Sequence, residues 1–519
     1  MADRHDVIII GGGSAGCAAA ARLSEDPRRK VLLLEGGPDP RPIPEVVSDP
    51  MKVLNLLMET PYVMMYPTER NLDGSVFYSL AGRILGGGSS VNMMSVIRPL
   101  PVDAQAWSQC GNPEWSWENI LPVLKRIESD EDYGDSEFHG KDGPLYVKRR
   151  YSFDKPVGGL QQAFIDACVS KGLPTCPDQN VPAPFGVSTT AYCVKDGKRQ
   201  SSAVAYLEPA RSRPNLTVLG EALVVSIKLS GDKVEAIRYE KDGKLHTVAG
   251  DQVVLSAGVY HTPQILMLSG VGPAAELERL GIPVVHPLEG VGENYQDHAV
   301  VFLTFESVKD PQEDWVVPGV MLNYKSSPER RCSDIQVIVR QPTALEGMKP
   351  LMPISVYLIE MSTRGRVRLK SVDPRELPGI DPRMLEHPDD VDRMVGAMRF
   401  VKELAETEPM REYYGPLIQP TPDEDWIRFA RSTYDSFHHG VGTCTMGPSS
   451  NHKAVVDQRL RVHGLSNLWI ADASVLPTIP HAHTNISSIM IGERLADFMK
   501  EGASSRRLDA TASNDSLAP

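Results

Sequence analysis

The sequence predicts an α/β protein in which a parallel, doubly wound sheet is joined to a second domain built on an antiparallel sheet. Near the N-terminus, residues 6–16 contain an apolar run that leads into glycines at Gly-x-Gly-x-x-Gly spacing and then into an alanine-rich segment. A second apolar run, residues 30–35, ends in a carboxylate. These two observations predict neighbouring strands of a parallel sheet with a helix between them. Strand-like runs between residues 301 and 434 predict the antiparallel sheet.

The N-terminal glycines predict a turn that binds a dinucleotide phosphate. Gly11 permits the tight turn, Gly13 lets the backbone approach a pyrophosphate, and Gly16 allows close packing of the following helix. Glu35 lies close to the ~20-residue spacing expected of a carboxylate that binds an adenosine ribose. Because a carboxylate disfavours the extra phosphate of NADP, the ligand is FAD or NAD; an ordinary βαβ turn is the alternative. Two further candidate binding residues in this turn are Ser14 and Ala15.

A second glycine cluster, residues 82–92, distinguishes the two dinucleotides. Its sequence, Gly-Arg-Ile-Leu-Gly-Gly-Gly-Ser-Ser-Val-Asn, can place bare backbone and short hydroxyls against a flat or phosphorylated ligand. A simple NAD domain has no use for such a loop, so the cluster favours FAD over NAD. A flexible loop without a ligand is the alternative. The candidate cofactor-binding residues here are Arg83, Gly88, Ser90 and Asn92.

Two later segments also resemble the ligand edge of a parallel sheet. Residues 251–272 read as a buried strand, a turn of small residues and a helix that glycines terminate. Asp472 follows another apolar strand, where its carboxylate could accept hydrogen bonds from a ribityl chain; a carboxylate that only stabilises the turn is the alternative. The remaining candidate cofactor-binding residues are Val224, Ala257, Ala473 and Thr484.

Composition narrows the possible partners and location. A chain of 519 residues is too long for one core, so two domains are expected. The net charge of −13 argues against nucleic acid and anionic membranes as partners. No apolar run reaches the ~20 residues of a membrane span, and a first strand at residue 6 leaves no room for a signal peptide, so we expect a cytoplasmic protein. The seven scattered cysteines predict reduced thiols and no metal site.

Several of these motifs together resemble the glucose–methanol–choline (GMC) family of FAD-dependent alcohol oxidoreductases. The resemblance rests on GGGSAG with Glu35, on RILGGGSSVN, on the segment ending in TPQILMLSGVGP, and on HGVGTCTMG and LWIADASVLPTIP near the C-terminus. It covers nearly the whole chain in the right order. The sequence Gly-Lys-Arg-Gln-Ser-Ser-Ala-Val-Ala-Tyr-Leu at residues 197–207 looks like the bacterial choline-dehydrogenase and hydroxymethylfurfural-oxidase branch.

The family resemblance assigns the chemistry to two histidines near the C-terminus. Hydride removal from an alcohol requires a base for the hydroxyl proton and a donor that stabilises the developing alkoxide, and neutral imidazoles can serve as both. The resemblance implies that His439 is the base and that His483 occupies the second position, which is His or Asn across the family. Asn485 is the competitor for that second role. His438 and His481 could be structural or could line the pocket.

The resemblance also implies how FAD is held and how the domains are divided. Some relatives tether FAD through a histidine in the glycine loop, but Val91 stands there, so we expect noncovalent FAD. Val259 replaces a small residue that usually follows Gly258 and would reshape the loop beside the flavin. We expect a discontinuous Rossmann-type FAD-binding domain and an α+β substrate-binding domain. Their expected ranges are 1–150, 210–300 and 435–519 for the first and 151–209 and 301–434 for the second, with a disordered tail at 503–519.

The expected substrate domain is an antiparallel sheet that covers the flavin. Its expected elements are strands at 300–305, 320–324, 334–339, 354–359 and 365–369 and a helix near 388–406. We expect the residues of this sheet to determine which alcohol is oxidised, because the shared fold alone does not identify the substrate. Six residues from it and its neighbours are candidates for the substrate pocket, and each could equally be a core or surface residue: Trp315, Tyr324, Arg340, Tyr357, Arg364 and Tyr434.

The expected substrate is a polar alcohol, such as a sugar, a glycoside or a benzylic or furanic alcohol. Choline is disfavoured because no aromatic and carboxylate cage for its cation is identifiable. We expect O₂ to reoxidise the flavin and to yield H₂O₂, with a quinone-type acceptor as the alternative. Three other classes are an NAD-dependent dehydrogenase, which would lack the 82–92 loop and the paired histidines, a non-redox lyase of the same fold, and a structural or light-driven FAD protein. The sequence leaves the oligomeric state open.

Overall fold

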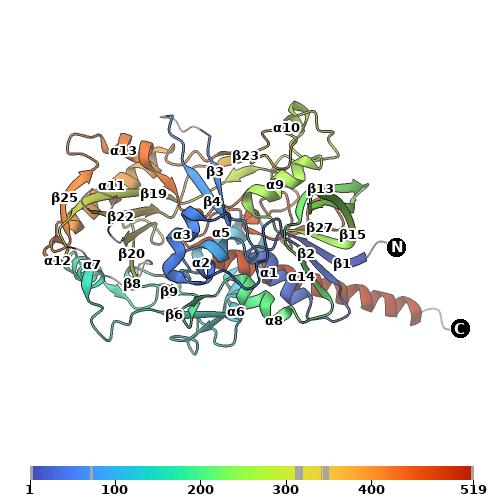
Figure 1. The fold of residues 1–519 in the computed structure, drawn as a ribbon, viewed down its shortest axis with the longest axis horizontal. Coiled ribbons are helices and arrows are strands. Elements are labelled where there is room, and N and C mark those ends of the chain that lie inside the picture. Colours follow the sequence, from blue (N-terminus) through green and yellow to red (C-terminus); the bar gives the residue numbers. More distant parts are fainter. Residues whose placement is uncertain (1–3, 70–73, 310–318, 341, 343–349, 516–519) are drawn as a thin grey trace.

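The computed structural model describes residues 4–69, 74–309, 319–340, 342 and 350–515. Two large sheets lie at opposite ends of the long axis (Figure 1). Strand β1 (Arg4–Ile10) and the start of helix α14 (Thr484–Asp515) lie toward the right of that view, with the first sheet. Within the described residues, no helix combines the length and the hydrophobicity that a bilayer crossing requires.

The first sheet has the strand order β12-β2-β1-β15-β14-β13, with β27 also paired to β15. Its parallel strands are β1 (Arg4–Ile10), β2 (Val31–Leu34), β12 (Leu216–Leu219), the C-terminal part of β15 (Lys244–Leu255) and β27 (Leu468–Ile470). An antiparallel extension consists of β13 (Leu223–Ser230) and β14 (Lys233–Lys241). All four residues of β2 are buried, as expected of a strand covered on both faces.

Helices α1 (Ser14–Leu23) and α14 (Thr484–Asp515) pack beside this sheet. The alanines of α1 are small and buried, which lets the helix lie close to its neighbours. Buried Glu493 of α14 accepts hydrogen bonds from Arg22 and Tyr206, and its other oxygen accepts one from Arg126. This carboxylate therefore links α14 to α1, to the π-helix η3 (Ala203–Leu207) and to α6 (Trp117–Ile127).

The second sheet has the order β25-β19-β22-β21-β20-β8-β7, with β26 also paired to β19. All of its pairs are antiparallel except β7 with β8. The strands are β7 (Thr175–Cys176), β8 (Gly186–Thr189), β19 (Ala299–Ser307), β20 (Val320–Tyr324), β21 (Ile335–Val339), β22 (Leu351–Leu358), β25 (Tyr414–Gln419) and β26 (Asp435–Ser436).

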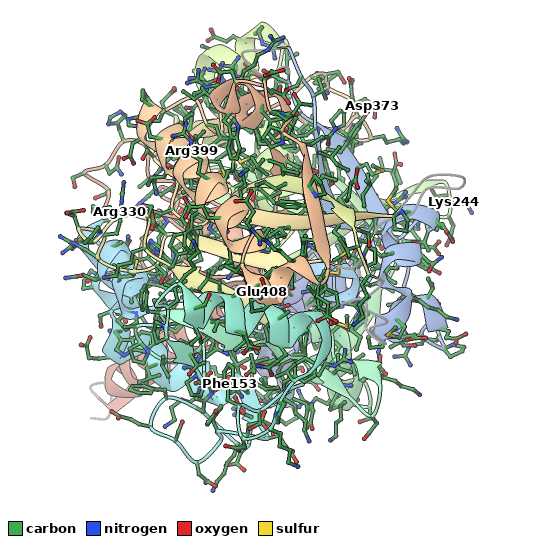
Figure 2. The ribbon with its side chains drawn as sticks, turned by 90° about the vertical axis from the view of Figure 1, so that its left-hand side faces the viewer. Phe153, Lys244, Arg330, Asp373, Arg399 and Glu408 are labelled. Carbon is green, nitrogen blue, oxygen red and sulfur yellow. The ribbon has the colours of Figure 1, made fainter. Side chains whose placement is uncertain are left out.

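Four helices share a buried apolar cluster with the second sheet. They are α7 (Gly159–Ser170), α11 (Pro388–Ala405), α12 (Glu408–Arg411) and α13 (Trp426–Thr433). Figure 2 looks onto this end of the molecule and shows the helix that carries Arg399 in front of the strands. Because helices cover this outer face, only the opposite face of the sheet is available to line a site.

Smaller elements complete the fold. They include the hairpin of β3 (Val63–Pro67) and β4 (Tyr78–Gly82), helices α3 (Val53–Glu59), α4 (Gly88–Val91), α5 (Pro101–Gln109), α9 (Gly258–Leu268) and α10 (Ala274–Arg279), and a sheet of β5 (Glu128–Asp130), β6 (Leu145–Arg149) and β9 (Ala191–Tyr192). The hairpin lies between the two large sheets in Figure 1.

Most expected elements of the second sheet are confirmed: β19, β20, β21 and β22 correspond to the four expected strands between 300 and 359, and α11 to the expected helix. The expected strand at 365–369 is present as β23 (Gly365–Arg368) but belongs elsewhere. It pairs with β18 (Glu293–Tyr295) and β24 (Gly379–Asp381) in a separate three-stranded sheet. Helix α14 spans Thr484–Asp515, and the expected disordered tail at 503–519 stays a prediction.

Candidate active site

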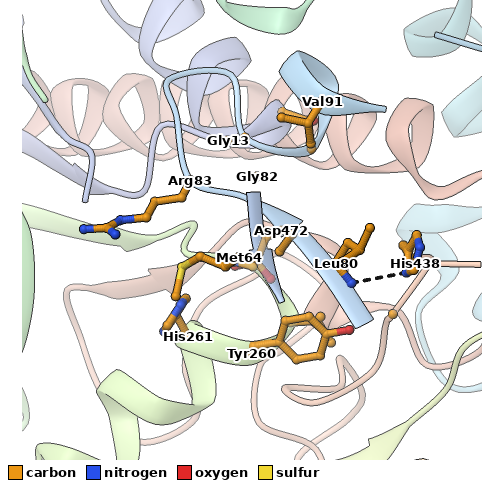
Figure 3. Close-up of a pocket in the computed structure, with 18 of the residues that line it drawn as sticks. Gly13, Met64, Leu80, Gly82, Arg83, Val91, Tyr260, His261, His438 and Asp472 are labelled. Carbon is orange, nitrogen blue, oxygen red and sulfur yellow. Dashed lines mark hydrogen bonds between the residues drawn. The ribbon is translucent and has the colours of Figure 1, made fainter. Parts of the chain in front are cut away.

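A cavity of ≈ 860 Å³ lies where the ligand edge of the parallel sheet meets the inner face of the second sheet. Its lining includes residues from the N-terminal turn, the 82–92 loop, the β3–β4 hairpin and the C-terminal loops. Figure 3 shows Arg83 and His261 toward one end of the cavity and His438 toward the other. Glycine-rich turns line one part of the cavity and side chains of the second sheet line another. This arrangement suits an elongated ligand along the turns and a smaller molecule beside the second sheet.

All but two of the predicted site residues line this cavity. Gly16 does not, because it packs under the turn, where an added Cβ would lie 2.0 Å from the Gly11 carbonyl oxygen. Ser90 does not either, because its hydroxyl is buried and donates to the Leu85 carbonyl at 2.8 Å. The residues that do line it are Gly11, Gly13, Ser14, Ala15, Glu35, Arg83, Gly88, Asn92, Val224, Ala257, His439, Asp472, Ala473, His483 and Thr484.

The two glycine loops pack directly against each other. Gly87 has φ +51°, and an added Cβ would lie 2.8 Å from the Gly13 Cα. Gly11 has φ +105°, and its Cβ would lie 2.2 Å from the Ser256 carbonyl oxygen. Glycine is therefore required at both positions by backbone conformation and by space.

The part of the cavity beside the N-terminus of α1 fits the phosphate of a dinucleotide. No side chain caps the N-terminus of α1, so its first N–H groups and the positive end of the helix dipole are available to an anion. Glu35 Oε2 accepts from the Gly12 N–H and Oε1 from the Gly37 N–H, each at 2.7 Å, which fixes the carboxylate at the end of β2. Burial raises the pKa of Glu35, although these two N–H groups and Arg83 oppose the shift.

Asp472 is also buried, but it is already engaged within the protein. Its Oδ2 accepts from the Gly258 N–H at 2.9 Å and from the Thr262 hydroxyl at 2.6 Å, and its Oδ1 accepts from the Ser474 N–H. Burial raises the pKa of Asp472 despite these hydrogen bonds. The carboxylate therefore joins the start of α9 to the C-terminal loop beside the cavity, and any bond to a ligand would use its remaining lone pairs.

His439 and His483 face each other in the cavity, with ring centroids 4.8 Å apart. Phe437 contacts both rings, with centroids at 4.2 Å from His439 and 5.0 Å from His483, and itself stacks on Tyr357. His483 Nε2 lies 3.2 Å from Gln336 Oε1. Burial lowers the pKa of His439 well below its usual range and that of His483 to about 3, so both imidazoles are neutral at pH 7.

Sequence reasoning missed two residues that hold His439. The Nδ1 atoms of His298 and His439 are 3.0 Å apart. The Asp297 carboxylate accepts from the His439 backbone N–H at 2.9 Å and from the hydroxyls of Tyr295 and Ser436. Burial raises the pKa of Asp297 to about 6. The available signal was a pair of polar residues immediately before an apolar strand, β19.

The other candidate histidines have different surroundings. His438 also lines the cavity, but its Nδ1 accepts a hydrogen bond from the Leu80 N–H at 3.2 Å, which ties it to β4 (Figure 3). His481 lies outside this cavity and forms an ion pair with Asp103. Asn485 Oδ1 accepts from the Ser14 hydroxyl at 2.8 Å, so this residue lies on the side of the phosphate turn.

The pocket candidates from the second sheet separate into three groups. Arg340 and Tyr357 line the cavity, and the Arg340 guanidinium donates to the hydroxyl groups of Tyr357 and Ser355. Tyr324 and Tyr434 are instead buried in the outer apolar cluster, and Arg364 lines a second cavity. The sequence could not show which face of its strand each side chain occupies. Trp315 lies outside the described residues.

Among the described residues, one buried group, Glu128, Asp130 and His139, has the side-chain types of a metal site. Its charges are already matched: Arg98 pairs with Glu128, and Arg149 pairs with Asp130. Burial alone would lower the pKa of His139, but hydrogen bonds to three carboxylates raise it to about 10. Both ring nitrogens of His139 lie 2.8–3.0 Å from carboxylate oxygens of Glu128, Asp130 and Asp178, so we describe this group as an ionic network.

Models of one protein family match most of the chain. Residues 5–300 and 362–492 match the N-terminal and C-terminal models described as GMC oxidoreductase. The chain belongs to the GMC oxidoreductase family. Flavin-dependent oxidation of an alcohol is therefore its chemistry, as its resemblance to that family implies.

Similar proteins span nearly the full chain. Human mitochondrial choline dehydrogenase is 32% identical, with 96% of this chain and 90% of the relative covered. Choline oxidase from Arthrobacter globiformis is 33% identical, with 99% and 97% covered. The crystal structure of pyridoxine 4-oxidase from Mesorbium loti superposes with a TM-score of 0.89 at 29% identity, covering 95% of this chain and 98% of that one.

Proposed function

We propose that this GMC oxidoreductase oxidises a polar alcohol to the carbonyl with His439 as the base and His483 as the second hydrogen-bonding group. The observation that carries the proposal is the facing pair of partly buried imidazoles, whose ring centroids are 4.8 Å apart and which both line the cavity. Bound FAD would accept the hydride. Residues 1–150, 210–300 and 435–519 would hold it, and the rest of the chain would shape the substrate end.

His298 determines which nitrogen of His439 acts as the base. Two Nδ1 atoms at 3.0 Å can bond only if one of them carries a proton. The backbone at Pro480 and Ile359 favours a proton on the His298 ring, although His298 Nε2 has no hydrogen-bond partner of ordinary geometry. We propose that this proton is on Nε2, which leaves His298 Nδ1 as an acceptor. His439 then donates from Nδ1 and keeps its lone pair at Nε2, where it can take the hydroxyl proton.

Gln336 orients the second imidazole. Its amide N–H₂ donates to Asn323 Oδ1 at 3.0 Å, so its Oε1 faces His483 Nε2 as an acceptor. The proton of neutral His483 therefore lies on Nε2. We propose that the substrate oxygen shares this proton, which would stabilise the alkoxide that develops as the hydroxyl proton leaves.

Noncovalent attachment of FAD is the second part of the proposal. Val91 lines the cavity where some relatives have a histidine. A valine side chain cannot form a bond to the flavin. Denaturation of the purified protein with acid should release all yellow colour into the supernatant, and flavin retained by the pellet would contradict the proposal.

We further propose O₂ as the electron acceptor, because a protonated His439 would place a positive charge where electron transfer to O₂ forms an anion. An anaerobic panel of sugars, benzylic, furanic and pyridoxine-like alcohols tests both substrate and acceptor. Bleaching of the flavin by one class identifies the substrate, and the absence of bleaching by every alcohol would contradict the alcohol-oxidising function. Return of the yellow colour within seconds of admitting air supports an oxidase, whereas reduced flavin that persists for minutes in air but turns over fast with a quinone requires a dehydrogenase.

We also propose a cytoplasmic location, which the seven free cysteines support because thiols stay reduced there.

A further inference from the structure

A buried arginine, Arg199, holds the second glycine loop from the side away from the cavity. It ends the short strand β11 (Lys198–Arg199) and is 3% exposed. Its Nε donates to the Val47 carbonyl of α2 (Glu45–Ser48) at 2.9 Å. Its Nη1 donates to the Ser89 carbonyl at 3.3 Å and to the Asn92 carbonyl at 2.6 Å, at the C-terminal end of α4. The mechanism proposed above does not use this guanidinium.

The charge of Arg199 has no carboxylate partner in the described part of the chain. Its hydrogen bonds all go to carbonyl and amide oxygens, and its Nη2 is buried without a partner. Burial lowers the pKa of Arg199 to about 10, so the guanidinium remains charged at pH 7. A buried charge without a counterion is costly and requires an explanation.

The other buried arginines show that this chain ordinarily provides such a counterion. Within the described residues there are four of them, and each forms an ion pair with a carboxylate: Arg98, Arg149, Arg393 and Arg494. Arg199 differs from them in its place, because it lies directly behind a loop that lines the large cavity. Its unpaired charge therefore indicates a role toward that cavity.

Asn92 connects this charge to the cavity. Its Oδ1 accepts from Arg199 Nη1 at 2.9 Å and from the Met94 N–H at 3.0 Å, and these two donors fix the orientation of the carboxamide. Its Nδ2 has no hydrogen-bond partner in the part of the chain that the structure describes, and the residue lines the cavity. A cation bonded to Oδ1 polarises the carboxamide, which makes Nδ2 a stronger donor.

We propose that Arg199 is a positioning residue for FAD, which acts through Asn92 by turning and polarising its carboxamide so that Nδ2 donates to the bound cofactor. The inference rests on the proposed function, because it takes FAD as the occupant of the cavity. FAD offers many acceptor atoms and carries negative charge on its phosphates, so a donor supported by a positive charge complements it. The loop is also close to the phosphate turn, since Gly87 packs against Gly13.

A double-mutant cycle on the dissociation constant for FAD tests the proposal. Arg199→Met removes the charge and retains an unbranched side chain, and Asn92→Ala removes the donor. In titrations of the apoproteins with FAD, each single change should raise the dissociation constant at least about tenfold. The double variant should bind FAD no more weakly than the weaker single variant, because both changes remove the same hydrogen bond.

Asn92→Asp tests the unpaired charge without altering Arg199. The new carboxylate has the shape of the amide and would pair with the guanidinium, so the melting temperature of the apoprotein should rise. The affinity for FAD should fall, because an acceptor takes the place of the donor. An arginine that only joined segments of the loop would not produce two changes of opposite sign.

Arg213→Met is the matched control. In the described residues Arg213 also donates only to neutral groups, the Ala21 carbonyl and the Ser24 hydroxyl, but at the far end of α1. Its replacement should lower the melting temperature and leave the affinity for FAD unchanged. A loss of FAD affinity equal to that of Arg199→Met would overturn the proposal, because it would show that general instability weakens binding.

Three further results would overturn the proposal. One is an unchanged affinity for FAD in Asn92→Ala, which decides the matter even if Arg199→Met does not fold. Another is a pair of single effects that multiply in the double variant, since Arg199 would then act independently of Asn92. The third is a melting temperature of Asn92→Asp that does not rise. An unaltered protein that binds no FAD would instead contradict the proposed function itself.

Discussion

The imidazoles of His439 and His483 are uncharged because of where they lie. Both residues are partly buried, which opposes a charge on either ring, and the positive charge of Arg340 nearby further opposes protonation of His483. A neutral ring can accept a proton from an alcohol, whereas an imidazolium cannot. The surroundings of the pair therefore keep both rings unprotonated near neutral pH, which is the form that can accept a proton.

Replacement of His439 by alanine tests its role as the base. We expect the rate of flavin reduction by alcohol to fall by roughly 10²–10⁴-fold, the usual effect of losing a general base. FAD content should persist, because the phosphate turn lies elsewhere in the cavity. Anaerobic stopped-flow spectroscopy measures the rate, and His438→Ala is the matched control. A crippled His438→Ala enzyme beside a nearly normal His439→Ala enzyme would contradict the assignment.

The lowered pKa of His439 also predicts the pH dependence of flavin reduction. Because the pKa of His439 is lowered, its imidazole stays unprotonated, and able to act as a base, down to a lower pH than an ordinary histidine. The limiting rate should therefore remain level as pH falls through about 6.5, where an ordinary imidazole becomes half protonated. Stopped-flow reduction at saturating alcohol measures this profile. A rate that halves near that pH would show that substrate and FAD restore an ordinary pKa.

The sequence pointed to the two histidines that we propose as base and partner, but not to the residues that contact them. His439 and His483 stand in recognisable motifs near the C-terminus. Asp297 and His298 could not be assigned, because their importance arises from contacts with residues far along the chain, such as Ser436 and His439. Nothing local distinguishes a carboxylate that will be buried from one that will be solvated.

At the scale of elements, the two glycine loops pack against each other as one unit. The turn before α1 and the turn before α4 touch at Gly13 and Gly87, and α14 begins beside them at Thr484. The strands behind these turns read clearly in the sequence, because fully buried parallel strands are continuously apolar.

Gly87→Ala should separate the loops and weaken FAD binding. The new Cβ would lie 2.8 Å from the Gly13 backbone, in a conformation with φ +51° that alanine disfavours. We expect the dissociation constant for FAD, measured by titration of the apoprotein, to rise at least about tenfold, or about 1.4 kcal/mol.

Gly231→Ala is the matched control for this prediction. Gly231 also has positive φ, +60°, but its Cβ would meet nothing within 4 Å. Gly231→Ala should also introduce backbone strain, visible as a lower melting temperature, without a change in FAD affinity. Equal loss of FAD affinity in both variants would show that the effect comes from general instability and not from the contact between the two glycine loops.

At the scale of the whole molecule, the cavity exists because two sheets of different construction meet along it. The parallel sheet supplies a ligand edge of turns and helix N-termini, and the antiparallel sheet supplies side chains from one face. Sequence motifs describe the first wall well, because its function depends on backbone and glycine. They describe the second poorly: of the five described pocket candidates only Arg340 and Tyr357 face the cavity, since alternation along a strand does not reveal which face is inside.

Arg340 predicts that the antiparallel wall selects against cationic alcohols, although named relatives act on choline. Its guanidinium donates to Ser355 and Tyr357 and has no carboxylate partner in the described part of the chain, so its charge is directed at the substrate end. Like charges brought together in a desolvated site repel strongly. Choline should therefore be a poor substrate compared with benzyl alcohol. Arg340→Gln should raise the kcat/KM for choline, divided by that for benzyl alcohol, at least about tenfold, or about 1.4 kcal/mol.

Arg375→Gln is the matched control. Arg375 also lines the cavity but is neutralised by Glu240 at 2.7 Å, so its replacement should leave this ratio unchanged. Efficient choline oxidation by the unaltered enzyme would refute this account, and with it the idea that the charge of one strand residue determines the substrate class.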